Sequence, residues 1–431
     1  MLFDLRSAYL LLIVLYLQLA LSLRFYATTS PGLEKLLLKE VKALKDVGLA
    51  KLGKCGVHFS GTFVTGMDAL MNLRTSLRLM ECLNEKDRNN KELHIDTKNA
   101  LYDYIYHEIP WLSYFGEGHQ ETTFSVSSTL GKVSEELSHS HFTSITIKNA
   151  IVDRLADESS SGLRPNVDTV DPTIPLSIYL HRGKVDVYRV LSGAKSMHKR
   201  GYREGKQHKA SLRESTAAAL VSATTWMDNG NRDFALADVM CGSGTLAIEA
   251  ALIYCNTSPG LIAFENTPPR LLEWNDVEHE YNGREEWNKI LTDTKAKDAR
   301  SEMKGTHIYV NDIHPEAVQM ARDAANKAGV SHIMHFSNED INQYNLPSQA
   351  EVSRVITNPP WDKRLVEDSA QAWAGLGRFA RSQIGSFNGN KAEMFCLAGE
   401  PSLLQNLEMQ PSSFLAFKSA NTDLRFIKYE V

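Results

Sequence analysis

The sequence is poor in cysteine, and its cysteines are not arranged to form a metal site. The 431 residues include five, with no C-x-x-C pair and no cluster of histidine and cysteine at metal-ligand spacing: Cys55, Cys82, Cys241, Cys255 and Cys396. A disulfide framework and a structural zinc site are therefore not expected, and we predict that the protein binds no metal.

An excess of basic residues is also missing. The chain has 47 Lys and Arg residues against 52 Asp and Glu residues, a formal net charge of -5. This balance excludes a global attraction to nucleic acid, so any site for a polyanion must be a local patch. The length and the 43% hydrophobic content predict a substantial core divided among two or three domains.

One local basic patch lies between residues 184 and 213, where nine Lys or Arg residues stand against two acids. Its stretch "SMHKRGYR", residues 196–203, holds too few apolar side chains for a core strand or helix. We expect residues 192–213 to form an exposed basic connector between two domains. Composition leaves open whether this connector tracks phosphates or is a solvated linker.

A long uncharged run occurs at the N-terminus, from Ser7 to Ser22, preceded by Arg6 and ending in small residues. This pattern predicts a signal peptide over residues 1–23. A retained membrane anchor is the weaker interpretation because the run is shorter than the roughly 20 apolar residues of a span. A mitochondrial presequence fits less well, since Asp4 is present and basic residues are scarce.

The rest of the chain has no secreted protein's cysteine pattern. We therefore expect an organelle reached through the secretory membrane, with a plastid of secondary origin favoured. The alternatives are a mitochondrion, or the cytoplasm if the start of the sequence is misassigned. No stable membrane association is expected after removal of the leader.

Residues 24–191 are predicted to mix helices and strands. A helix capped by Ser30, with Pro31 in its first turn, opens this region. The further expected elements are helices over 66–83 and 139–155, a strand over 121–130, and a hairpin over 174–191 that turns at "HRGK". No catalytic constellation is found in this region.

From Ser211 the pattern alternates between helix and strand. The expected helices cover 211–226, 241–254 and 314–329, and the expected strands cover 232–240, 306–313, 331–341 and 351–357. Such alternation predicts an α/β fold with a parallel, doubly wound sheet and helices on both faces. Its ligands should bind at the carboxyl ends of the strands.

The G-x-G-x-x-G fingerprint of dinucleotide-binding proteins is missing at the first strand end. The stretch "DVMCGSGT", residues 238–245, instead places Gly242 and Gly244 in a turn between strand and helix, followed by Leu246 and Ala247. Missing side chains there let a ligand approach the backbone and the helix amides. Taken alone, the same pattern also fits a tight turn without a ligand.

Acidic residues mark the next two strand ends. Asp312 is placed to accept hydrogen bonds from both hydroxyls of a ribose, with a cap on the helix that starts at Pro315 as the alternative. Asp340, in "NEDI", is placed to accept from an exocyclic adenine amine, or it simply begins a loop. Together with the glycine turn, these residues predict a nucleoside-binding site.

The fourth strand ends in "NPPW", residues 358–361. Asn358 and the carbonyl of Pro359 offer two oxygens to an amino group on a planar ring, because Pro360 has no amide hydrogen that would compete for that carbonyl. Trp361 offers a flat face for stacking. The pattern predicts attack by an exocyclic nitrogen on an activated methyl group, with positioning as the main catalytic contribution. The alternative, a stiff surface turn, is disfavoured by the glycine turn and acid that precede it.

As an ordered set, these motifs resemble class I S-adenosylmethionine-dependent amino-methyltransferases. Upstream and closing stretches are similar to the THUMP-domain RNA guanine-N2 methyltransferases, most of all the bacterial large-subunit ribosomal RNA enzyme: "FYATTSPGLEKLLLKEVKAL", "HSHFTSITIKNAIVDRL", "RPNVDT", "LHRGKVDVYRVLSG", "SMHKRGYR" and "NTDLRFIKYEV". The resemblance covers the chain from about residue 24 to the C-terminus.

The resemblance implies a domain order: a ferredoxin-like part (24–66), a THUMP RNA-binding domain (67–191), the connector (192–213) and a methyltransferase domain (214–431). It implies that S-adenosylmethionine is the cofactor and that nine residues contact it: Asp238, Cys241, Gly242, Ser243, Gly244, Thr245, Asp312, Ile313 and Asp340. It implies that the target guanine is held by Asn358, Pro359, Pro360 and Trp361. Structured RNA, ribosomal or transfer, would lie near Lys195, Arg200 and Arg203, and the protein would be a monomer.

The sequence departs from the family in three places. Trp361 replaces the more usual tyrosine, "NTDLRF" lacks a more usual glycine, and the charged segment 267–304, with Trp274 and Trp287, is long and predicted to be partly helical and packed. We do not expect the second methyltransferase domain that some bacterial relatives carry.

Three other functions compete with this interpretation. A protein-glutamine or DNA-adenine amino-methyltransferase could use the same Asn-Pro-Pro-aromatic turn, although the RNA-binding module disfavours both. A non-catalytic RNA-binding or ribosome-assembly protein with a decayed cofactor pocket is disfavoured by the intact strand-end motifs.

Overall fold

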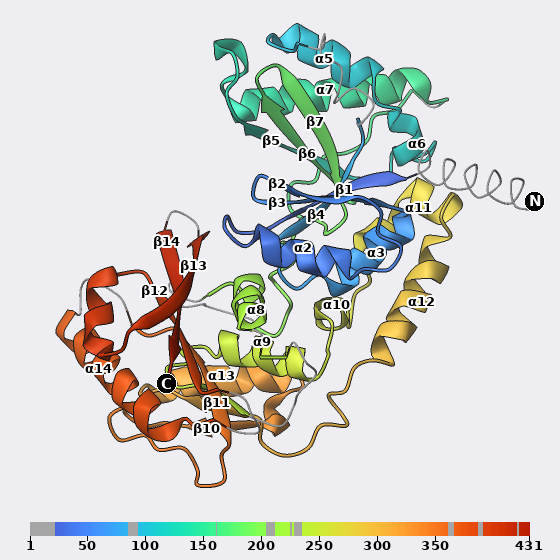
Figure 1. Ribbon diagram of the computed structural model, residues 1–431. Helices are drawn as coiled ribbons and strands as arrows, with labels where there is room; N and C mark the ends of the chain where they lie inside the picture. Colours follow the sequence, from blue (N-terminus) through green and yellow to red (C-terminus); the bar gives the residue numbers. More distant parts are fainter. Residues whose placement is uncertain are drawn as a thin grey trace, which may run out of the picture.

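The computed structural model describes residues 22–84, 94–160, 162–203, 212–224, 226–227, 235–360, 366–386, 391–419 and 422–431. The predicted leader, up to residue 21, and Trp361 lie outside the described residues. In the described parts of the chain, no helix is both long and apolar enough to cross a bilayer. Two seven-stranded sheets organise the molecule, one in each half (Figure 1).

The N-terminal half contains a sheet of order β2-β3-β1-β4-β7-β6-β5. Its first elements are β1 (Leu23–Thr28), α2 (Glu34–Lys42), β2 (Ala50–Gly53), β3 (Gly56–Gly61), α3 (Phe63–Asn72) and β4 (Arg78–Cys82). Its later elements are α5 (Lys98–His107), α6 (Trp111–Phe115), β5 (Phe124–Leu130), α7 (Ser140–Glu158), β6 (Ile174–His181) and β7 (Lys184–Val190). The predicted hairpin is confirmed: Arg182 and Gly183 at its turn both have positive φ.

Two expectations for this half are corrected. The first helix begins at Glu34 rather than near Ser30, because Gly32 has a φ of +98° and lies against the backbone of residue 416. A single helix is expected over 66–83, but the structure has two elements there: the helix α3 ends at Asn72, and strand β4 follows. The antiparallel pairing of β4 with β1 draws residues 78–82 into the sheet, which outweighs their local helical pattern. The division predicted after residue 66 lies inside α3.

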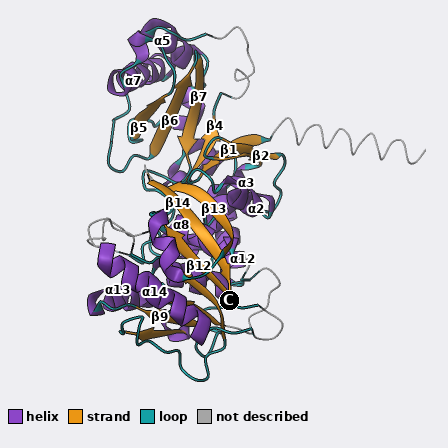
Figure 2. Ribbon diagram, turned by 60° about the vertical axis from the view of Figure 1, so that its left-hand side comes forward, coloured by secondary structure: helices purple, strands orange, loops and turns teal. Residues whose placement is uncertain are grey.

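The C-terminal half confirms the doubly wound sheet. Strands β10-β9-β8-β11-β12 are parallel, and the antiparallel hairpin β14-β13 completes the sheet. The strands are β8 (Ala235–Asp238), β9 (Ile308–Asn311), β10 (Met334–Ser337), β11 (Val352–Thr357), β12 (Glu393–Ala398), β13 (Pro411–Ser419) and β14 (Thr422–Glu430). Helices α8 (Glu214–Ala223), α9 (Thr245–Tyr254) and α13 (Pro315–Lys327) pack on one face, and α14 (Val366–Gln383) packs on the other (Figure 1). Figure 2 shows the helices of this half in purple and its strands in orange.

The charged segment between α9 and β9 packs against the N-terminal half. It forms α10 (Pro259–Ala263), α11 (Asn275–His279) and α12 (Gly283–Lys295). Helix α11 lies beside α6, and α10 and α12 lie beside α3 (Figure 1). Trp274 is 1% exposed and donates from Nε1 to the carbonyl of Thr173 at 2.7 Å. Trp274, Val277 and Trp287 belong to the same apolar core as β1 and α3. The segment, which we name the strap (residues 259–295), therefore joins the core of the other half.

A buried ion-pair network fixes the strap. Arg189 of β7 is fully buried and donates from Nη1 and Nη2 to the carboxylate of Asp276 in α11, at 2.7 and 2.8 Å. Its Nε and Nη2 also donate to Glu81 of β4, at 3.0 and 2.7 Å. The guanidinium lies over the ring of Trp274, 4.2 Å from its centre. This geometry specifies one position for the strap on the N-terminal sheet.

Candidate functional site

Three polar side chains lie at neighbouring strand ends of the C-terminal sheet. Asp238 ends β8, Asp312 follows β9, and Asn358 follows β11. Since β8 pairs with β9 on one side and with β11 on the other, these residues share one edge of the sheet, at the point where the strand order reverses. The structure thus brings together the strand ends that the sequence singles out, and the roles assigned to their residues stay predictions.

The carboxylate of Asp238 is 1% exposed. Its Oδ1 accepts a hydrogen bond of 2.8 Å from Thr357 Oγ1, whereas its Oδ2 has no partner among the described residues. Burial, with a smaller contribution from the charge of Asp312, raises the pKa of Asp238 to about 7. A buried carboxylate oxygen without a partner is costly, so this atom indicates that a donor or cation of a ligand completes the site.

The turn between β8 and α9 leaves its backbone accessible on one side. Gly242 and Gly244 have φ values of +53° and +76°. A Cβ at Gly244 would lie 2.7 Å from the Cβ of Ala321 in α13, whereas a Cβ at Gly242 would meet no atom within 4 Å. Gly244 is therefore required for helix packing, and Gly242 leaves open space through which a ligand can approach the turn.

Cys241, in the same turn, is a buried free cysteine. Its backbone N–H donates to the carbonyl of Asn311 at 2.9 Å, which ties the turn to β9. Burial raises the pKa of the Cys241 thiol well above its usual value, so the thiol stays protonated at neutral pH. The Cys241 side chain can therefore line the site, but it is not suited to act as a nucleophile.

Both carboxylate oxygens of Asp312 accept backbone hydrogen bonds. Oδ2 accepts from the N–H of Gly242 at 2.8 Å, and Oδ1 accepts from the N–H of His314 at 3.0 Å. Asp312 does not cap α13, whose N-cap residue is His314. Each oxygen keeps a lone pair that can accept from a hydroxyl. The neighbouring side chain of Ile313 is 56% exposed and offers an apolar surface beside this carboxylate.

Asp340 is engaged in a local turn. Its Oδ1 accepts from the backbone N–H and the side-chain amide of Asn342, at 2.9 and 2.8 Å. This arrangement fits the loop-forming alternative for one oxygen of the carboxylate, and contact of Asp340 with an adenine amine stays a prediction.

The turn after β11 is held rigidly. Asn358 is half-buried, Pro359 is buried, and Pro360 is exposed. Trp373 of α14, itself 0% exposed, donates from Nε1 to the carbonyl of Pro360 at 2.8 Å. The two prolines restrict φ, and the tryptophan fixes the far end of the turn. Trp361 is outside the described residues, so its predicted stacking role rests on the sequence.

The basic connector is only partly exposed, which corrects the expectation for two of its arginines. Lys195 is exposed, as a residue near an RNA path requires. Arg200 is 1% exposed and pairs with Glu249 of α9 at 2.8 Å, and the side chain of Arg203 is 6% exposed and pairs with Glu214 of α8 at 3.0 Å. Both arginines neutralise buried acids, so in this arrangement neither guanidinium is available to a phosphate.

Sequence reasoning missed four residues that support the site. Thr357 and Trp373 hold Asp238 and Pro360, and Glu214 holds Arg203. The side chain of Asn311 donates to the carbonyls of Val239 and Glu339, at 3.3 and 3.0 Å, and so links two strand ends. A signal was present for Thr357 and Asn311, since each is a polar residue at the end of an apolar strand.

A cavity of about 610 Å³ lies past the carboxyl end of β12, the strand next to β11. Its walls come from the turn before α2, the loop after β12 and the hairpin of β13 and β14. Most of the lining is apolar, and Lys418 and Arg425 supply positive charge, with Lys418 paired to Asp423 at 3.1 Å. The cavity therefore suits a ligand that combines an apolar surface with negative charge.

Together, these features fit a nucleoside that carries a positive charge. The partnerless oxygen of Asp238 suits a cationic donor, the lone pairs of Asp312 suit ribose hydroxyls, and the open space at Gly242 gives access to the backbone. In the described ranges, no group of three or more His, Cys, Asp or Glu side chains is arranged to hold a metal ion.

Comparison with known proteins gives three family matches. The RMKL-like methyltransferase domain matches residues 200–422, the RlmL ferredoxin-like domain matches residues 24–80, and the THUMP domain matches residues 97–190.

Solved structures share the fold over almost the whole chain. A possible methylase from Clostridium difficile 630 is 24% identical with a TM-score of 0.77, covering 95% of this chain and 98% of its own. A predicted N6-adenine-specific DNA methylase from Listeria monocytogenes is also 24% identical with a TM-score of 0.77, covering 96% and 98%. SMU.472, complexed with SAH, is 20% identical with a TM-score of 0.76, covering 95% and 98%.

Proposed function

Because the chain belongs to the RMKL-like methyltransferases, we propose that it methylates the exocyclic amine of a guanine in RNA, forming N2-methylguanosine, with large-subunit ribosomal RNA as the favoured substrate. The observation that carries the proposal is the rigid turn at Asn358, held by Trp373 and next to the strand ends of Asp238 and Asp312. A turn that offers two oxygens beside a cofactor site is suited to a planar amine.

S-adenosylmethionine is the methyl donor of this enzyme, and when bound it supplies an electrophilic methyl group. Asp312 would accept from the ribose hydroxyls, and Asp238 would face a positively charged part of the molecule with its partnerless oxygen. Gly242 leaves room for this ligand at the turn.

The turn would orient the amine. The side-chain oxygen of Asn358 and the carbonyl of Pro359 accept the two hydrogens of the amine, which directs the nitrogen lone pair at the methyl group. As the new N–C bond forms, the S–C bond of the donor would break, with S-adenosylhomocysteine as the leaving group, and the nitrogen would lose one proton to solvent. Such positioning can lower the activation free energy of methyl transfer by about 7 to 11 kcal/mol, so no strong base is required in the turn.

The N-terminal half supports RNA as the substrate. It matches the RlmL ferredoxin-like and THUMP models, and residue Lys195 of the connector is exposed. The apolar cavity with Lys418 and Arg425 lies past the end of β12, the strand that pairs with β11, and it suits a nucleotide that flanks the guanine. Transfer RNA is the second substrate within the same proposal.

The test is mass spectrometry of nucleosides from purified RNA classes, with and without the protein. Large-subunit, small-subunit and transfer RNA are prepared separately from organelles and cytosol, because residues 1–23 predict an organelle. We expect N2-methylguanosine to fall in one class, large-subunit RNA being favoured, and to return with the wild-type chain but not with Asn358→Ala.

Three outcomes would contradict the proposal. Unchanged N2-methylguanosine in every class would exclude the reaction, and loss of N6-methyladenosine from DNA or RNA would assign the turn to adenine. Restoration by Asn358→Ala would support a non-catalytic RNA-binding role instead.

A further inference from the structure

We propose that Arg203 is a positioning residue that holds the cofactor loop, residues 241–245, from the connector between the two halves, so that cofactor affinity depends on how the N-terminal half is docked. The inference depends on the use of S-adenosylmethionine and not on which base is methylated.

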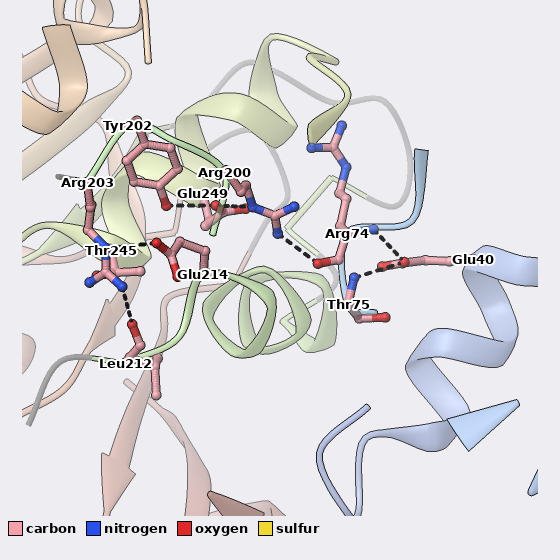
Figure 3. A network of polar contacts seen from close by, with 10 residues as sticks. All are labelled: Glu40, Arg74, Thr75, Arg200, Tyr202, Arg203, Leu212, Glu214, Thr245 and Glu249. Atoms are coloured by element: carbon pink, nitrogen blue, oxygen red, sulfur yellow. Dashed lines mark hydrogen bonds and ion pairs between the residues drawn. The ribbon is translucent and has the colours of Figure 1, made fainter. Parts of the chain in front are cut away.

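The guanidinium of Arg203 reaches four residues, of which Thr245, Glu214 and Leu212 are drawn in Figure 3. Nη1 donates to Thr245 Oγ1 at 2.7 Å and to Ser243 Oγ at 3.3 Å, and these are the two hydroxyl side chains of the cofactor loop. Nε donates to Glu214 Oε1 at 3.0 Å, and Nη2 donates to the carbonyl of Leu212 at 3.1 Å. One side chain thus ties the loop to the start of α8.

The loop needs such an external hold. Gly242 and Gly244 give it conformational freedom, and Gly244, the N-cap residue of α9, has no side chain that could cap the helix. Backbone hydrogen bonds of Cys241 and Gly242 already tie the first part of the loop to Asn311 and Asp312. The hydroxyls of Ser243 and Thr245 are the side-chain groups through which the second part of the loop can be held, and Arg203 binds both.

The charge of Arg203 indicates a purpose other than helix stability. A cation beside the N-terminus of α9 opposes the helix dipole, so its position is unfavourable for α9 alone. Glu214, 2% exposed, offsets this charge. A buried ion pair of this kind adds little net stability, although it specifies one geometry for the groups that it contacts.

The same connector binds the N-terminal half. Arg200 donates from Nε to Glu249 Oε1 at 2.8 Å and from Nη2 to the carbonyl of Arg74 at 2.7 Å, and Tyr202 donates to Glu249 Oε1 at 2.8 Å (Figure 3). The backbone N–H of Arg74 donates to Glu40 of α2 at 2.9 Å. Glu249 lies in α9, one turn after Thr245, so a displaced N-terminal half would disturb both the helix and its loop.

The test measures the affinity of the full chain for S-adenosylhomocysteine by calorimetry. We expect Arg203→Met to weaken binding roughly 10- to 30-fold, because the loop loses its charged donor. Arg203→Lys should recover part of the affinity, since an ammonium reaches one hydroxyl but not the whole set. Lys199→Met, which removes the same charge from an exposed position of the connector, should leave the affinity unchanged.

Hydrogen exchange separates positioning from stability. In Arg203→Lys, amides of residues 241–249 should exchange faster while those of β11 and β12 stay protected. An affinity within twofold of wild type in both Arg203 variants, with only a lower free energy of unfolding, would overturn the proposal. If Arg203→Met does not fold, Thr245→Val tests the same contact, and it should weaken binding more in the wild-type chain than in Arg203→Lys.

Discussion

Thr357 Oγ1, at the end of β11, donates a hydrogen bond of 2.8 Å to Asp238 Oδ1, at the end of β8, and accepts one of 3.1 Å from the N–H of Met240. The hydroxyl therefore orients the carboxylate, and we expect the other oxygen, Oδ2, which has no partner among the described residues, to face the cofactor. We expect Thr357→Val to weaken binding of S-adenosylhomocysteine roughly tenfold, because one buried hydrogen bond to a charged group is lost. Thr357→Ser keeps the hydroxyl, so its affinity for S-adenosylhomocysteine should be within about twofold of wild type. Calorimetry measures both affinities. Equal losses of affinity in the two variants would mean that packing of the Thr357 methyl group, and not its hydrogen bond, is responsible.

The stability of the protein should depend on pH through Asp238. Burial raises its pKa from 3.8 to about 7 in the folded state, so the folded chain retains a proton that the unfolded chain releases. As pH rises from about 4 to about 7, the wild type should lose stability relative to Asp238→Asn, by at most about 1.4 kcal/mol per pH unit, and the difference should be constant above that range. Urea unfolding of both proteins without cofactor measures this difference, and parallel curves from pH 5 to 8 would contradict it.

Mutations in the turn at residues 358–360 and in the cofactor site should have separable effects on turnover and on cofactor affinity. Trp373→Phe removes the donor to the Pro360 carbonyl and keeps most of the packing, so turnover should fall while the affinity for S-adenosylhomocysteine stays within a few fold of wild type. Asn358→Ala should abolish turnover with the same retained affinity. A single-turnover assay on target RNA, combined with calorimetry, would check both, and parallel loss of affinity would mean that the turn belongs to the cofactor site.

The strap should contribute to global stability through Asp276. Asp276→Asn breaks the bidentate pair with Arg189 and leaves a buried guanidinium partly uncompensated, which should lower the free energy of unfolding by roughly 3–5 kcal/mol. Asp293→Asn, an exposed change of the same kind in α12, should have little effect. Denaturant unfolding compares the two variants, and a change below 1 kcal/mol in Asp276→Asn, taken as an approximate limit, would show that water or the carboxylate of Glu81 compensates Arg189.

The C-terminal sheet could be predicted because its signals are local. Every residue of β11 from Val352 to Thr357 is buried, as expected of a strand covered on both faces, and glycines or acids follow the strands where the chain turns. The same locality brought Asp238, Asp312 and Asn358 to one edge, because parallel strands share their carboxyl end.

The errors concern contacts between residues far apart in the chain. Composition predicts that "SMHKRGYR" is exposed, yet Arg200 is buried because its partner, Glu249, lies 49 residues further on. In the same way, the sequence around Asp276 contains no signal for its pairing with Arg189, which lies 87 residues away in the chain. The charge of an arginine alone does not show whether its side chain is exposed to solvent or is buried in an ion pair with an acidic residue of another helix or strand.

The strap has a consequence for how the protein can vary. Since Trp274 donates to the carbonyl of Thr173 and Asp276 pairs with Arg189, the surface of the N-terminal half is contacted by side chains encoded within the methyltransferase half. A chimera that joins one homologue's N-terminal half to another's catalytic half would combine a strap and a sheet that did not evolve together. We expect positions 189, 274 and 276 to vary in concert among relatives, and transplanted halves to work only when the strap is exchanged with the sheet that it covers.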